Sequence, residues 1–101
     1  MEVDFSQIIR DLDGVSLKND DKSDAKLKNV CEKALLSEAP GVKVTDEDKL
    51  KRYSLALKIH DAVDKLDLTT DDISFIKKSI SAVFPTLIVG RSFEMLEGKH
   101  L

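Results

Sequence analysis

The sequence has one cysteine, Cys31, no tryptophan, and only two prolines and four glycines in 101 residues. One thiol cannot form a disulfide within the chain, which is typical of proteins from a reducing compartment. An all-β domain needs many tight turns and more of the residues that form them. Aromatic residues make up 5% of the chain and charged residues 35%. This composition predicts one domain that is mostly helical.

The sequence also lacks long apolar runs and an excess of positive charge. The run AVFPTLIVG ends at Arg91 and is much shorter than the ~20 residues of a membrane span. The first stretch, MEVDFSQIIRDLDG, lacks the basic-then-apolar order of a signal peptide. We therefore expect a cytoplasmic protein that does not contact a membrane. The net charge of -3 also argues against nucleic acid as a partner, because such binding needs a basic face.

Residues 3–18 have the pattern of a β-hairpin. Asp13-Gly14 is a turn signal because both residue types tolerate positive φ. Pairing across this turn places Leu12 opposite Val15 and Arg10 opposite Leu17. Two strands alone are not stable in water, so the hairpin must pack on helices or pair with another chain.

Four segments have helical patterns: 24–38, 46–66, 70–84 and 86–97. Thr45 and Thr69 have the position and chemistry of N-caps and precede acidic residues, which suit the positive end of a helix. Ser23 is the candidate cap of the first helix, which we expect to stop before Pro40-Gly41. The first helix carries a stripe of small and apolar residues at helical spacing: Leu27, Val30, Cys31, Ala34 and Leu35.

The last two helices are separated at Pro85, since the residue before proline avoids the helical region. Gly98 is the expected C-terminal stop. The predicted fold is therefore mainly α, with an N-terminal β-hairpin packed on a bundle of about four helices.

The helix at 46–66 has apolar residues on two sides. One side carries Leu50, Tyr53 and Leu57, and the other carries Leu55, Ile59, Ala62, Val63 and Leu66. A helix with two apolar sides is typical of a central position. We expect this helix to be the centre of the bundle.

The last helix is more apolar than one neighbour requires. Gly90 costs about 1 kcal/mol relative to alanine inside a helix, which a close approach of a second backbone would offset. The surplus apolar surface either contacts a second chain or is covered by the hairpin. The surplus is part of the apolar surface formed by Leu87, Ile88, Val89, Phe93, Met95 and Leu96.

Catalytic and metal-binding patterns are scarce. The two histidines are His60 and His100. His60 has Asp64 four residues on, a spacing that can orient a proton-transfer group or form a surface pair. The sequence contains no HExxH, CxxC or phosphate-loop motif, and the acidic stretch from Asp11 lacks the spacing of a calcium loop. We predict that the protein is not an enzyme and uses no cofactor or metal.

Three stretches, IIRDLDGVSL, DKLKRYSLALKIHDA and FPTLIVGRSFEMLEG, together resemble small proteins encoded in tailed-phage and prophage genomes. They share the order of a D-x-D-G hairpin, a KLKRY-type helix and a [YF]-P-x-L-[IV]-V-G helix before a terminal L-E-G. The resemblance covers nearly the whole chain. It implies a virus-encoded protein in a bacterial cytoplasm, and it carries no activity or site residue.

The predicted function is therefore non-enzymatic contact with a protein partner: self-association as a homodimer, virion assembly, or modulation of a host protein. The core remains the alternative for each apolar candidate, and Arg91 is expected at the rim because arginine is enriched in interfaces. A second hypothesis is a DNA-binding regulator of helix-turn-helix type, although its recognition helix begins with two aspartates and lacks base-reading side chains. The candidate contact residues are Phe5, Ile9, Leu87, Val89, Arg91, Phe93 and Met95.

Overall fold

The computed structural model describes residues 1–38, 41 and 43–98. It has two short strands, β1 (Glu2–Asp4) and β2 (Lys65–Asp67). Its four helices are α1 (Leu27–Leu36), α2 (Asp46–Asp61), α3 (Thr70–Val83) and α4 (Thr86–Leu96). The predicted fold class is confirmed: the chain is mainly α, and a two-stranded antiparallel pairing that includes the N-terminal strand β1 packs against the helices. Among the described residues, none of the helices has both the length and the apolar content that a membrane span requires.

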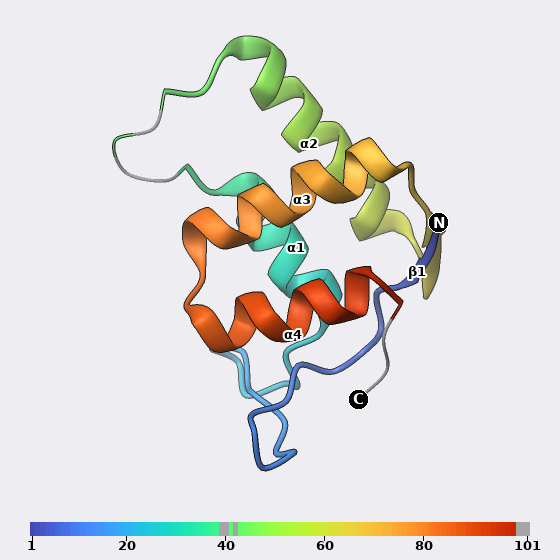
Figure 1. Cartoon of the computed structure of the whole chain (residues 1–101), viewed down its shortest axis with the longest axis vertical. Helices are drawn as coiled ribbons and strands as arrows, with labels where there is room; N and C mark the ends of the chain where they lie inside the picture. Colours follow the sequence, from blue (N-terminus) through green and yellow to red (C-terminus); the bar gives the residue numbers. More distant parts are fainter. Residues whose placement is uncertain (39–40, 42, 99–101) are drawn as a thin grey trace.

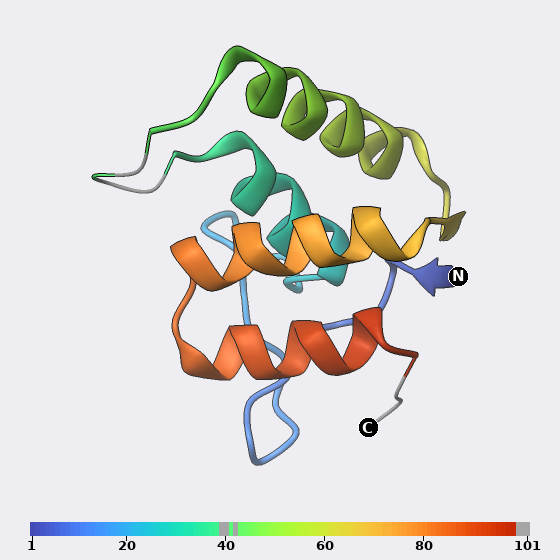
Figure 2. The same ribbon diagram turned by 45° about the horizontal axis from the view of Figure 1, so that its top comes forward.

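The central helix is α1, which packs against α2, α3 and α4 (Figures 1 and 2). The stripe predicted for this helix is confirmed, because all of its members are buried. The most exposed of them, Val30, is only 5% exposed. Burying five side chains of one short helix gives the fold its core. That core also contains Phe5, Ile9, Ile59, Ile76, Ile80 and Leu96.

The prediction that the helix at 46–66 is central is wrong. α2 lies at the outside of the molecule and buries only Leu55, Ala56 and Ile59. The other apolar side stays uncovered by the described chain. Its members Leu50, Tyr53 and Leu57 are 68%, 59% and 44% exposed.

The same predicted helix is also too long. α2 ends at Asp61, because Ala62 is extended (φ -69°, ψ 134°). The chain then forms β2, which pairs antiparallel with β1 and sets Val3 opposite Leu66. β1 therefore pairs with a segment whose first two residues, Lys65 and Leu66, were predicted to be the end of a helix.

The chain reverses around Asp13-Gly14 as predicted, but the register differs. Arg10 pairs with Ser16 rather than with Leu17. The carboxylate of Asp11 accepts hydrogen bonds from the backbone N–H groups of Asp13 and Val15, at 2.9 and 3.0 Å. Gly14 has φ +85°. The loop therefore spans residues 12–14, and we call residues 10–16 the hairpin tip.

Two of the three predicted helix caps are confirmed. The hydroxyls of Thr45 and Thr69 accept hydrogen bonds from the backbone N–H groups of Asp48 and Asp72, at 3.2 and 3.1 Å. Ser23 does not cap α1. We call residues 5–18 the N-terminal ribbon. Lys26 holds the cap position, because residues 24–26 still pair with this ribbon. The predicted stop at Pro40-Gly41 lies partly outside the described residues.

We expect Thr69→Ala to lower the free energy of unfolding by about 1 kcal/mol, because a backbone N–H of the first turn loses its acceptor. Urea denaturation followed by circular dichroism measures this change. Thr70→Ala is the matched control, since Thr70 is exposed and its hydroxyl makes no hydrogen bond within the described residues. Equal losses in both variants would contradict the role of Thr69 as a cap.

No other part of the described chain approaches Gly90 closely. A Cβ atom placed there meets nothing within 4 Å, so packing within this chain does not require a glycine at this position. We expect Gly90→Ala to raise the free energy of unfolding by about 0.5–1 kcal/mol. Gly14→Ala should lower it, because φ is +85° there. Thermal unfolding of both variants measures these two changes in stability. A Gly90→Ala variant less stable than the wild type would contradict the finding that there is room for a Cβ atom at this position.

Candidate functional site

The structure separates the predicted contact residues into buried and accessible ones. Phe5 and Ile9 are 1% and 0% exposed, so the prediction that they contact a partner is wrong. Their side chains turn inward and pack with α1 in the core. The predicted residues of α4 keep partial exposure. These residues are Leu87, Val89, Arg91, Phe93 and Met95.

Phe93 is further covered by its own chain. The ammonium of Lys77 lies 5.3 Å from the centre of the Phe93 ring. The same ammonium is 2.7 Å from the carboxylate of Glu97. This arrangement leaves Arg91 and Met95 as the predicted residues that border an open feature of the surface.

That feature is a groove of about 460 Å³ between the hairpin tip and α4. Arg91 and Met95 reach it from α4. The remaining sides come from the N-terminal ribbon, which supplies both apolar and charged groups. We call it the hairpin-tip groove, and the residues used below are Ile8, Arg10, Leu12, Asp13, Arg91 and Met95.

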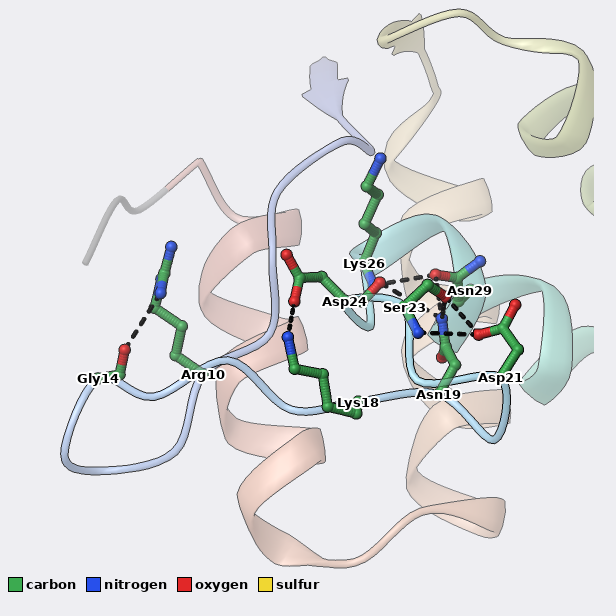
Figure 3. A network of polar contacts seen from close by, with 9 residues as sticks. All are labelled: Arg10, Gly14, Lys18, Asn19, Asp21, Ser23, Asp24, Lys26 and Asn29. Carbon is green, nitrogen blue, oxygen red and sulfur yellow. Dashed lines mark hydrogen bonds and ion pairs between the residues drawn. The ribbon is translucent and has the colours of Figure 1, made fainter.

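Arg91 ties the hairpin tip to α4. Its Nε donates a hydrogen bond to the backbone oxygen of Arg10 at 3.1 Å, and its Nη2 donates one to the oxygen of Asp11 at 2.9 Å. Within the tip, Nη1 of Arg10 donates to the oxygen of Gly14 at 3.1 Å (Figure 3). A planar guanidinium with two bonds fixes orientation as well as distance. Arg91 therefore anchors its own hairpin.

The tip held in this way presents apolar side chains to solvent. Leu12 is 86% exposed and Val15 is 61% exposed. The predicted register placed them in a cross-strand pair, and neither was among the predicted contact residues. A signal was present, because turn regions are normally polar and these two residues flank Asp13-Gly14.

The hairpin-tip groove is lined by two arginines, Arg10 and Arg91, and by one carboxylate, that of Asp13. Neither Arg10 nor Arg91 takes part in an ion pair there. The Nε and Nη2 atoms of Arg10 have no hydrogen-bond acceptor among the described residues. The carboxylate of Asp11 already binds backbone N–H groups, and Asp13 is exposed. The groove thus offers an arginine fork beside apolar side chains.

A larger groove of about 780 Å³ lies on the other side of the ribbon, between residues 17–25, α1 and the corner where α3 meets α4. Figure 3 shows the polar network on its rim. The amide nitrogen of Asn19 donates to Ser23 Oγ, the oxygen of Asp24 and Asn29 Oδ1, at 3.1, 3.3 and 3.2 Å. Lys18 also pairs with Asp24. These bonds stabilise the loop and engage the side chains of Lys18 and Asn19 within the chain.

The network lowers the pKa of two carboxyl groups below their ordinary value of 3.8. Hydrogen bonds from Ser23 lower the pKa of Asp21, and the bond from Lys18 lowers that of Asp24. Each group therefore stabilises the folded loop above its ordinary pKa and stops doing so as the pH falls through its lowered value.

We expect the loop at 18–24 to loosen only below about pH 4, because the carboxylates must be protonated first. NMR titration of the side-chain carboxyl carbons of Asp21 and Asp24 measures this. Ser23→Ala is the control and should move the pKa of Asp21 back towards 3.8. An unchanged titration of Asp21 in that variant would contradict the role of Ser23.

The candidate catalytic histidine has a structural partner. Nδ1 of His60 lies 2.7 Å from Oε1 of Glu32 on α1. Asp64, the expected partner, lies beyond the end of α2, and His100 is outside the described residues. No group of three or more His, Cys, Asp and Glu side chains could hold a metal ion within the described ranges. Cys31 is buried, and burial raises the pKa of its thiol.

Comparison with protein-family models, with curated proteins and with solved structures gives no match. The helix-turn-helix hypothesis can be compared with the arrangement of α2 and α3. The segment between them, 62–69, contains β2 and is longer than the 3–4-residue turn of that motif.

Proposed function

We propose that this chain is a non-enzymatic protein that acts by binding other proteins, copies of itself included, and that the hairpin tip is a contact surface. The observation that carries the proposal is the 86% exposure of Leu12 on a loop fixed by Arg91 and Asp11. A loop that is already ordered loses little conformational entropy when a partner binds. An apolar residue held in solvent in this way is suited to insertion into a partner.

The resemblance to tailed-phage proteins suggests the setting. In a bacterial cytoplasm, the contacts would serve virion assembly or the modulation of a host protein. Neither role needs a nucleophile, a general base or a cofactor. Both need a surface that a partner can recognise, and the exposed tip with its adjoining groove provides one.

A photo-crosslinking amino acid placed at position 12 tests the proposal in cells that make the full chain. We expect discrete crosslinked products from position 12 and none from the matched position Ser81, which is also exposed. Adding Arg91→Ala should weaken the products, because the tip is no longer held. The same pattern of products from positions 12 and 81 would contradict a specific contact at the tip.

A further inference from the structure

We propose that copies of this chain associate head to tail, with the N-terminal half of α2 of one copy in the hairpin-tip groove of the next. This inference rests on the proposed function and assigns its partner, a second copy of this chain. Three observations carry it: an uncovered half-helix, the charge that this half-helix presents, and a groove of complementary charge at the opposite end of the molecule.

One face of the N-terminal half of α2, which carries Leu50 and Tyr53, is left exposed by the rest of the described chain. No residue from Asp46 to Ser54 is buried. Most helices in proteins are stabilised by burying one apolar face, and here that face is exposed. Leu50 and Tyr53 share it, and Asp46 lies on the same side because it precedes Leu50 by four residues.

The basic residues of this half are already engaged within the chain. Lys49 lies 3.5 Å from Glu38, and the ammonium of Lys51 lies 4.7 Å from the centre of the Phe75 ring. Arg52 donates to backbone oxygens at the end of α1. Asp46 and Glu47, in contrast, form no ion pair within the described residues. The half-helix therefore presents acidic groups followed by apolar side chains.

The hairpin-tip groove has the complementary character. The free Nε–Nη2 edge of Arg10 can bind a carboxylate through two parallel hydrogen bonds, and the carboxylate of Asp46 is the natural candidate. Leu12 and Met95 provide the apolar area against which Leu50 and Tyr53 can pack. Tyrosine, methionine and arginine are the residue types enriched in protein interfaces.

The two surfaces lie at opposite ends of the molecule, whose longest extent is 39 Å. In Figures 1 and 2, α2 is at the top and the hairpin tip is at the bottom. One copy therefore cannot satisfy both surfaces by itself. A contact between two different patches generates rings or open chains of copies. Because charge contributes to it, the association should weaken as salt concentration rises.

The test uses two variants, each of which blocks one surface. Leu12→Asp blocks the groove, and Tyr53→Asp blocks α2. Both positions are exposed, so both variants should fold. Ser81→Asp is the matched control, because it adds the same charge at an exposed position on α3. Sedimentation velocity over a range of concentrations measures the mass of each protein and of the equimolar mixture of the two blocked variants.

We expect the mass of the wild type and of Ser81→Asp to rise with concentration, while each blocked variant stays a monomer. The mixture should form a one-to-one dimer that grows no further, because it holds one intact copy of each surface. A wild type that is monomeric throughout overturns the inference, and so does a mixture that fails to dimerise. Crosslinks from position 12 to other proteins would still support the proposed function in either case.

Discussion

Phe5→Ala is expected to lower the free energy of unfolding by about 3–5 kcal/mol, as deletions of buried aromatic rings do. The total stability of a domain of this size is about 5–15 kcal/mol, so the variant should be close to unfolding. The side chain of Phe5 is 1% exposed and belongs to the core cluster around α1. Its backbone oxygen accepts a hydrogen bond from Lys28 N–H at 3.0 Å, and this bond does not depend on the ring. The expected loss of unfolding free energy therefore measures the packing of the Phe5 ring in the core.

Urea denaturation followed by circular dichroism measures the loss, and Leu12→Ala is the control. Leu12 is an apolar residue of the same N-terminal ribbon, but it is exposed, so its truncation should change stability by no more than about 0.5 kcal/mol. If Phe5→Ala were as stable as the wild type and instead failed to self-associate, Phe5 would be a contact residue. The core described here would then be wrong.

The parts of the fold that were predicted correctly depend on residues close together in sequence. The stripe of α1 repeats with helical spacing, and the caps at Thr45 and Thr69 act on backbone groups within one turn. The break between α3 and α4 follows from the geometry of Pro85 and its neighbour. Each of these features is decided by interactions within a few residues, which a sequence pattern records directly.

The features that could not be predicted depend on contacts between distant segments. Whether the second apolar side of α2 is covered depends on the path of the chain after Asp61, which returns as β2 to pair with β1. Neither three-residue strand has a pattern long enough to be recognised. A central helix and an outer helix with one exposed apolar side therefore have the same sequence pattern.

The candidate site shows the same limit at the level of single residues. Arg91 was expected at the rim of an interface, and it borders the groove, but its bonds go to a loop 81 positions away in its own chain. The register of the hairpin was missed because Asp11 uses its side chain to lengthen the turn. That lengthening fixes Leu12 in solvent rather than in a strand pair. The conformation of the exposed tip thus depends on the side chains of Arg91 and Asp11, whose hydrogen bonds form only in the folded chain.

Cys31 is expected to resist alkylation at pH 8 by at least about a thousandfold relative to the unfolded chain. The side chain is 0% exposed, and burial raises the pKa of the thiol, so the thiolate that reacts is scarce in the folded state. Reaction then requires opening of the structure around α1. For a stability of about 5 kcal/mol, global opening alone gives a factor of more than a thousand, since each 1.4 kcal/mol is tenfold.

The alkylation rate of Cys31 also tests whether α1 and the N-terminal ribbon unfold together. If α1 opens only when the whole domain unfolds, Phe5→Ala should accelerate alkylation by at least about a hundredfold, in proportion to the stability lost. Leu12→Ala should leave the rate unchanged. Mass spectrometry of iodoacetamide-treated protein over time measures both. Fast labelling of the wild type, insensitive to Phe5→Ala, would mean that α1 opens locally and is not the stable centre against which α2, α4 and the hairpin are held.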